Sequence, residues 1–139
     1  MAHVTVDRDI ETGVLRFTVT GLAEVRDIVP HIISEYPKHP GAPILWDFSR
    51  GLFSCASIDE LKQLSSIAQE FGACRAGACT AIALQHRADE VQMKYYVELT
   101  KLKLPETRYA VFDDCGKADI WLLAMPHGAA YPSAAMVAA

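Results

Sequence analysis

The sequence predicts an α/β fold: a mixed, mostly parallel sheet of about five strands, opened by an N-terminal hairpin and covered by helices. Two observations lead to this prediction. Residues 14–20 alternate between apolar and polar side chains, which is typical of a half-buried strand. Further along, short apolar runs alternate with stretches of helical periodicity. Strands separated by helices need right-handed crossovers, and these make the strands parallel.

The first third of the chain predicts the hairpin and one helix. Residues 3–7 and 14–20 form the two strands, and Glu-Thr-Gly marks the turn between them. Apolar residues at helical spacing then predict a helix over residues 23–36. Pro30 leaves two readings open: it kinks this helix, or it lies in the first turn of a shorter helix that begins near Asp27.

Residues 42–64 form the unit around which the other elements are arranged. An apolar strand over residues 44–48 is followed by a loop over residues 49–57. Ser57 and Glu60 then have the spacing of a capping box, in which each side chain bonds to the backbone amide of the other residue. We therefore expect a well-defined helix to begin directly after Ser57.

The remaining elements repeat the alternation of strand and helix. We expect strands at residues 80–84 and 109–112 and helices at residues 87–102 and 116–123. The helix over residues 87–102 is expected to bury one line of apolar side chains, formed by Val91, Tyr95, Leu99 and Leu102.

A single domain is expected over residues 1–124, followed by a tail over residues 125–139 that is rich in alanine and proline. The protein has 139 residues and a formal net charge of -4. The acidic balance and the scattered basic residues argue against nucleic-acid binding. No apolar run approaches the roughly 20 residues that span a bilayer, so we expect a cytoplasmic protein with no membrane span.

The four cysteines show no CxxC pair, and the five histidines show no spacing typical of metal ligands. We therefore expect no metal site and no cofactor. The cysteines are interpreted as small, partly buried apolar residues of a reducing compartment.

In parallel sheets, functional sites form beyond the carboxyl ends of the strands. We expect such a site, for a partner or a ligand, at the end of the central strand, together with the residue that follows the next strand. Its members are Asp47, Ser49, Leu52, Phe53, Ser54, Cys55, Ser57 and His86. Leu52 and Phe53 are expected to be exposed apolar residues of the loop. Asp47 could instead bond to nearby backbone amides, and Ser57 could be a helix cap alone.

The order of elements and the strand end LWDFS, followed by a loop and a capped helix, resemble STAS domains of the SpoIIAA-like, anti-anti-sigma type, which share a sheet with CRAL-TRIO-like proteins. In that family the loop carries Asp-Ser-Ser-Gly, and its first serine is phosphorylated. The resemblance places Cys55-Ala56-Ser57 at this motif, so the acceptor position falls on Ala56. Ser57 or Ser54 would be the phosphoacceptor only in a register shifted by one or two residues.

Three functions remain open. The resemblance implies a non-catalytic regulatory module that binds a protein partner through the loop and helix after the central strand, and a second copy of the chain is another partner to consider. The alternative is a binder of a small apolar or lipid-like ligand, held between the sheet and the helix over residues 87–102. An enzyme that uses Cys55 with His86 ranks last, because a nucleophile, a base and an orienting group cannot all be assigned.

Overall fold

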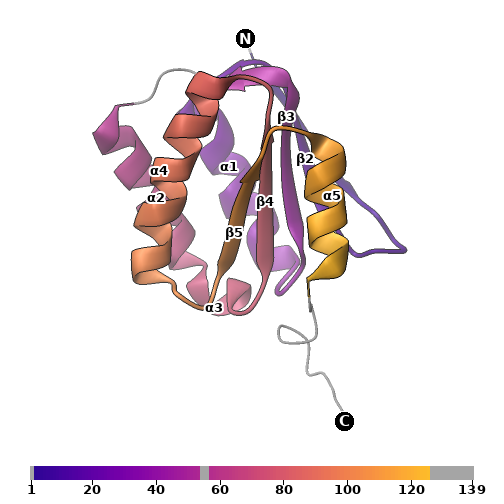
Figure 1. The fold of residues 1–139 in the computed structure, drawn as a ribbon. Coiled ribbons are helices and arrows are strands. Elements are labelled where there is room, and N and C mark those ends of the chain that lie inside the picture. The colour runs from indigo at the N-terminus through magenta and orange to yellow at the C-terminus, as the bar shows by residue number, and fades with distance from the viewer. Residues whose placement is uncertain (1, 54–56, 126–139) are drawn as a thin grey trace.

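The computed structural model describes residues 2–53 and 57–125, and within them the chain forms a five-stranded sheet in the order β1-β2-β3-β4-β5 (Figure 1). β1 and β2 pair antiparallel, and the later neighbours pair parallel, so the predicted mixed sheet and its opening hairpin are confirmed. The strands are β1 (His3–Arg8), β2 (Leu15–Ala23), β3 (Ile44–Phe53), β4 (Cys79–Leu84) and β5 (Arg108–Phe112).

The helices lie on both faces of this sheet. They are α1 (Val25–Glu35), the short 3-10 helix η1 (Tyr36–Lys38), α2 (Ile58–Glu70), α3 (Gly72–Arg75), α4 (Arg87–Lys103) and α5 (Cys115–Ala124). α1, α2 and α4 cover one face, and α5 lies on the other (Figure 1). Pro30 lies inside α1, so the shorter helix beginning near Asp27 is wrong.

The main core lies between the sheet and the three helices α1, α2 and α4. Alternation along β2 and β3 sends Phe17 and Trp46 to this side, where their rings stack with centroids 4.2 Å apart. Trp46 also donates its ring N–H to the Tyr36 hydroxyl at 3.0 Å, which satisfies both buried groups. Trp46 is therefore a core residue.

β3 is longer than the sequence predicts, and this corrects the expected loop over residues 49–57. The strand continues to Phe53 because a bulge after Asp47 absorbs one extra residue: Thr18 pairs with Asp47, whereas Thr20 pairs with Arg50. Gly51 permits the close pairing that follows, since a Cβ atom there would lie 2.6 Å from the carbonyl oxygen of Val19.

α4 buries a different face from the predicted one. Its buried side chains are Asp89, Met93, Tyr96, Val97 and Thr100. The predicted inward line is wrong, because Val91, Tyr95 and Leu102 are exposed and Leu99 is half-buried. The helix is apolar on two faces, so periodicity alone could not show which face meets the sheet.

α3 occupies part of the expected connector after α2 and contributes Arg75, which is fully buried. Its guanidinium donates to the carbonyl oxygens of Ala42 and Cys79 and to the Thr80 hydroxyl, and it lies over the Tyr36 ring. Arg75 thus ties together the segments that enter β3 and β4.

Candidate functional site

The carboxyl ends of the parallel strands place several predicted residues on one edge of the sheet, at the top of Figure 1. Ser57 begins α2, and the predicted capping box is confirmed: the Ser57 hydroxyl accepts from the Glu60 amide at 3.1 Å, and the Ser57 amide donates to the Glu60 carboxylate at 3.0 Å. His86 is exposed and precedes α4 as its N-cap residue. We call the exposed Leu22, Leu52, Ser57, Ile58 and His86 the rim.

Leu52 and Phe53 differ in exposure. Leu52 is 40 % exposed, as predicted for a residue that meets a partner, whereas Phe53 is 3 % exposed and packs in the main core. The predicted exposure of Phe53 is wrong because the residue is the last of a strand, and alternation turns its ring toward the helices. The ring makes an edge-on contact with Phe48.

Leu22 is the strand neighbour of Leu52, and the sequence reading missed it. The two leucines are register partners on β2 and β3, so their side chains leave the sheet on the same face. Leu22 is 51 % exposed. Together they form an apolar pair at the carboxyl end of two paired strands. The pair follows from the extension of both strands, β2 to Ala23 and β3 to Phe53. The alternating pattern in the sequence did not reveal that extension.

Asp89 anchors the end of β3 and was also missed. This buried residue lies in the first turn of α4, and its carboxylate accepts a hydrogen bond from the Phe53 amide at 2.9 Å. A carboxylate is favoured near a helix N-terminus, where the free amides and the helix dipole stabilise its charge. Asp89 therefore fixes the end of β3 at Phe53, the residue that follows the exposed Leu52.

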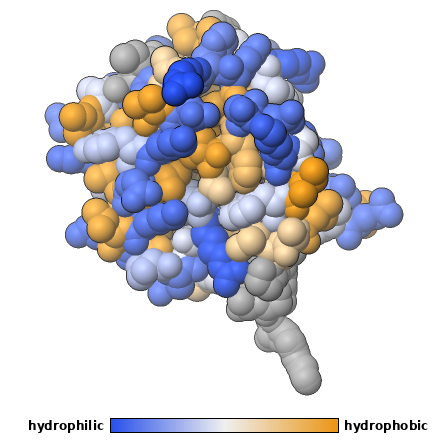
Figure 2. Space-filling view, viewed as in Figure 1, coloured by the Kyte–Doolittle hydropathy of each residue, from blue (hydrophilic) through white to orange (hydrophobic). Residues whose placement is uncertain are grey.

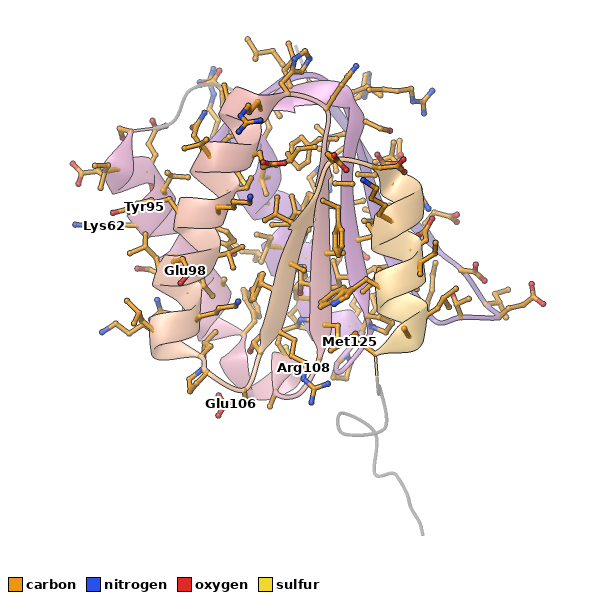
Figure 3. The ribbon with its side chains drawn as sticks, viewed as in Figure 1. Lys62, Tyr95, Glu98, Glu106, Arg108 and Met125 are labelled. Carbon is orange, nitrogen blue, oxygen red and sulfur yellow. The ribbon has the colours of Figure 1, made fainter. Side chains whose placement is uncertain are left out.

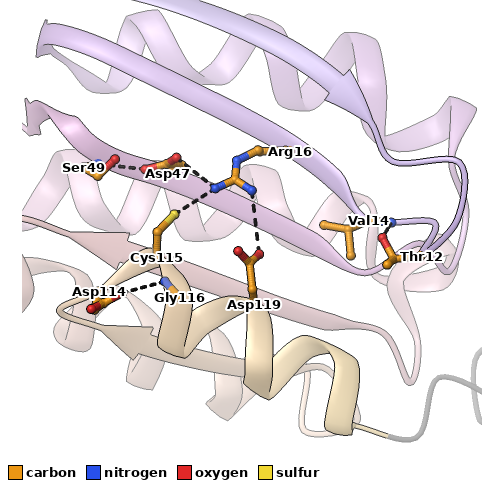
Figure 4. Close-up of polar contacts among 9 residues, drawn as sticks. All are labelled: Thr12, Val14, Arg16, Asp47, Ser49, Asp114, Cys115, Gly116 and Asp119. Carbon is orange, nitrogen blue, oxygen red and sulfur yellow. Dashed lines mark hydrogen bonds and ion pairs between the residues drawn. The ribbon is translucent and has the colours of Figure 1, made fainter.

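Asp47 lies on the face of the sheet covered by α5, in a network of polar side chains (Figure 4). It accepts from the Ser49 amide at 2.8 Å and from the Arg16 guanidinium at 3.2 Å. Arg16 also donates to the sulfur of Cys115 at 3.0 Å and forms a looser ion pair with Asp119 at 3.7 Å. Asp47 thus bonds to a nearby backbone amide, and its bond to exposed Ser49 holds the bulge in β3.

The network shifts the pKa values of Asp47 and Cys115 in opposite directions. Burial alone would raise the pKa of Asp47, but hydrogen bonds from Ser49, Cys115 and Arg16 outweigh burial and hold that pKa below its usual value. Burial, with the hydrogen bond to Asp47 and the charge of that residue, raises the pKa of the Cys115 thiol to about 11. Cys115 is therefore a neutral thiol at neutral pH and a poor nucleophile.

Ser54 and Cys55 lie outside the described residues, together with Ala56. The hypothesis of a Cys55–His86 pair stays a prediction, as does phosphorylation of Ser54 or Ser57. Among residues 2–53 and 57–125, no group of three or more His, Cys, Asp or Glu side chains could hold a metal ion. None of the helices within these ranges is long and apolar enough to cross a membrane.

A cavity of about 30 Å³ lies between the sheet and the helices α1, α2 and α4, where a lipid-like ligand was considered. Its lining is mostly apolar and includes Trp46, Phe53, Met93 and Tyr96. Such a volume is far below the roughly 300–1,000 Å³ of pockets that hold small molecules. An apolar ligand would enter only if the helices moved away from the sheet.

The hairpin, the parallel strands and the arrangement of helices define a SpoIIAA-like α/β fold. The structure is similar to that of an uncharacterized protein from Shewanella loihica PV-4, of the DUF3478 family, which has a SpoIIAA-like fold. The TM-score is 0.51, the sequence identity is 17 %, and the alignment covers 87 % of this chain and 93 % of the other. The sequence matches no protein-family model and no curated protein.

Proposed function

We propose that the protein is a non-catalytic, cytoplasmic regulatory module that binds a protein partner at its rim. The observation that carries this proposal is the pair Leu22 and Leu52, two exposed leucines on neighbouring strands at the carboxyl end of the sheet. Single exposed apolar residues are ordinary on a protein surface, but adjacent ones favour association because a partner removes both from water.

The base of this pair is rigid. Phe53, which follows Leu52, is buried in the core, and its amide donates a hydrogen bond to the Asp89 carboxylate. Gly51 lies in close contact with the backbone of β2. A partner would therefore meet side chains on a fixed backbone, and binding would cost less conformational entropy than it would on a loose loop.

The beginning of α2, at the same edge of the sheet, carries two further exposed residues, Ser57 and Ile58. The capping box accounts for the Ser57 hydroxyl. A negative charge at position 57 would be compatible with the helix N-terminus, because aspartate is also a good N-cap residue. Ser57→Asp therefore changes the charge of the rim and leaves the helix capped, whereas Ser57→Ala removes the cap.

The test compares partners recovered from the native cell by crosslinking and mass spectrometry. Wild-type protein, Leu52→Arg and Leu22→Arg are the baits, and Ile10→Arg is the matched control. Ile10 is an almost wholly exposed residue at the turn between β1 and β2. We expect at least one protein that is retained by wild type and by the control and is lost with both rim variants.

Direct titration of that recovered protein should then show affinity weakened at least ~10-fold by Leu52→Arg, because a charge would be placed where apolar area is buried. Equal recovery by all four baits, or equal affinity of the rim and control variants, would exclude the rim as the binding surface.

A further inference from the structure

The two outer strands of the sheet differ in how they are covered. β5 is flanked by α4 and α5, and Figure 3 shows it between α4, which carries Tyr95 and Glu98, and α5, which ends next to Met125. Figure 2 shows charged and apolar groups intermixed over this side of the molecule. β1 forms the opposite edge, and among the described residues only β2 pairs with it. One side of β1 therefore has no strand beside it.

The hydrogen-bond pattern shows which backbone groups of β1 point to this free edge. The Asp9 amide donates to the Val14 carbonyl oxygen at 2.9 Å, so these two residues form a hydrogen-bonded pair. In an antiparallel ladder, such pairs alternate with pairs whose N–H and C=O groups point away from the neighbour. Counting back along the register from Asp9, the residues that bond to β2 are His3, Thr5 and Asp7. The groups that point to the free edge are therefore those of Val4, Val6 and Arg8.

The middle of β1 lacks the features that commonly keep an edge strand from pairing, such as a proline, a lysine or a bulge. The strand contains neither proline nor lysine, and its register with β2 is continuous from His3 to Arg8. Asp7 and Arg8 place charge at one end only. The central residues Val4, Thr5 and Val6 are β-branched, which suits them to a strand with neighbours on both sides. The free edge can therefore accept another strand.

We propose that β1 pairs with β1 of a second copy, antiparallel about a two-fold axis at Thr5, so that the two sheets form one continuous sheet. This register sets Val4 opposite Val6 of the second copy. Both residues have free backbone groups that point to the edge, so each such pair exchanges both of its hydrogen bonds. The same strand lies on both sides of the interface, as two-fold symmetry requires.

The side chains opposed in this register are compatible, which identifies a second copy as the occupant. Val4 and Val6 are half-buried and pack against the main core, so each would cover apolar area of the other copy. The alternate residues point to the other face of the sheet. There His3 lies opposite Asp7 of the second copy, and its imidazole N–H can donate to that carboxylate. Thr5 lies opposite Thr5 of the second copy, which is a favourable cross-strand pair.

The neighbouring registers fit less well. A shift by one residue would set groups that point to the edge against residues already bonded to β2. An axis at Val6 would set Val4 opposite Arg8, so that an apolar side chain meets a charged one. An axis at Val4 would pair only residues 3–5 of the two strands, whereas the axis at Thr5 pairs residues 3–7. The axis at Thr5 therefore gives the best match of the strand to itself.

The first test is the oligomeric state of the full chain, measured by sedimentation velocity over a dilution series. Wild type should show a reversible monomer–dimer equilibrium. Thr5→Lys and Thr5→Glu should each raise the dissociation constant at least ~10-fold, because like charges would face each other at the axis. An equimolar mixture of the two variants should dimerise more tightly than either alone, because lysine then faces glutamate. The controls Ser66→Lys and Ser66→Glu, at an exposed position of α2, should leave the constant unchanged.

Thr5 is exposed, so thermal melting should show that its variants stay folded. A monomeric wild type at every concentration would overturn the proposal. A dimer that both Thr5 variants leave intact would overturn it as well. A mixture that dimerises no more tightly than the single variants would overturn the axis at Thr5. With an axis at Val6, Thr5→Lys would instead tighten the dimer, because the lysine would face Asp7 of the second copy.

Amide hydrogen exchange tests the pairing in the wild-type protein. As the protein concentration rises through the dissociation constant, exchange at the Val4 and Val6 amides should slow, because these donors become bonded to the second copy. The Thr5 amide is already bonded to β2, so its exchange should change less. Exchange at Val4 and Val6 that does not depend on concentration, or that slows no more than at Thr5, would overturn the pairing of the two β1 strands.

Discussion

The two faces of the sheet are built from the same strands but differ in what they bury. Toward α1, α2 and α4 the strands present large side chains, including Phe17, Trp46, Phe48 and Ile82. Toward α5, β4 presents the small residues Cys79, Ala81 and Ala83, next to Leu45 of β3, Phe112 of β5 and the polar pair Arg16 and Asp47. The first face is closed by three helices, and among the described residues α5 alone covers the second.

This difference shows how one strand can serve two purposes. Adjacent residues point to opposite faces, so Phe17 is fully buried in the main core while its neighbour Arg16 reaches a half-buried polar network. The large apolar face contributes most of the stability. The face toward α5 can carry charge because partial exposure reduces the cost of desolvation.

The largest expected effect is at Phe17. Phe17→Ala should lower the free energy of unfolding by about 3–5 kcal/mol, because it removes a buried ring stacked on Trp46 and leaves a cavity. The matched control is Arg16→Ala on the other face, where the loss should be about 1 kcal/mol. Urea unfolding followed by tryptophan fluorescence measures both. Equal losses of unfolding free energy in the two variants would mean that the two faces of the sheet contribute equally to stability.

Gly51→Ala comes next, with an expected loss of about 1–3 kcal/mol, because the new methyl group would overlap the rigid backbone of β2. The control is Gly72→Ala, whose methyl group would meet the side chain of Leu104 instead, at 2.8 Å. A leucine side chain can move aside, so the control should lose less. A Gly51→Ala protein as stable as wild type would contradict the close approach of the two strands.

The Asp47 network should give a smaller, pH-dependent effect. Asp47→Asn should destabilise the protein by about 1–2 kcal/mol at pH 7. The pKa of Asp47 is lowered by folding, so its contribution is complete above the unfolded pKa of about 3.9 and is lost as the pH falls through the lower folded pKa. Unfolding curves measured from pH 7 down should therefore converge for wild type and variant. A difference that stays constant with pH would show that the charge of Asp47 has no role.

Cys115 should show the smallest effect, in reactivity. With a thiol pKa of about 11, it should react with iodoacetamide roughly 10-fold more slowly than a model thiol at pH 7.5. Peptide mapping separates it from the other cysteines. Asp47→Asn should speed the reaction, because the carboxylate that opposes the thiolate is removed. A rate equal to that of the unfolded chain would contradict the hydrogen-bonded, partly buried thiol.

Local signals predicted most of the fold. The alternation in β2 and the capping box at Ser57 each describe neighbours in sequence, and both appear in the structure. Three features depend on distant parts of the chain and could not be predicted in this way. The bulge in β3 needs the register with β2, the buried face of α4 needs the position of the sheet, and the bond of Arg16 to Cys115 joins residues 99 positions apart.

The candidate site was predicted less completely than the fold. The predicted edge of the sheet holds Leu52, Ser57 and His86, but Phe53 turned inward when the loop proved to be a strand. Leu22 and Asp89 could be recognised only from pairing between elements.

The bulge in β3 also bears on how the chain can change length. Before it, even-numbered residues such as Trp46 and Phe48 face the main core, and after it Phe53 does. Removing one residue at Ser49 would restore a regular ladder with the same rings inside. The end of β3 would stay opposite Ala23 of β2, because the extra residue of a bulge adds no length along the paired strands. The bulge is therefore a point at which the chain can lose one residue while the edge and the core both stay in register.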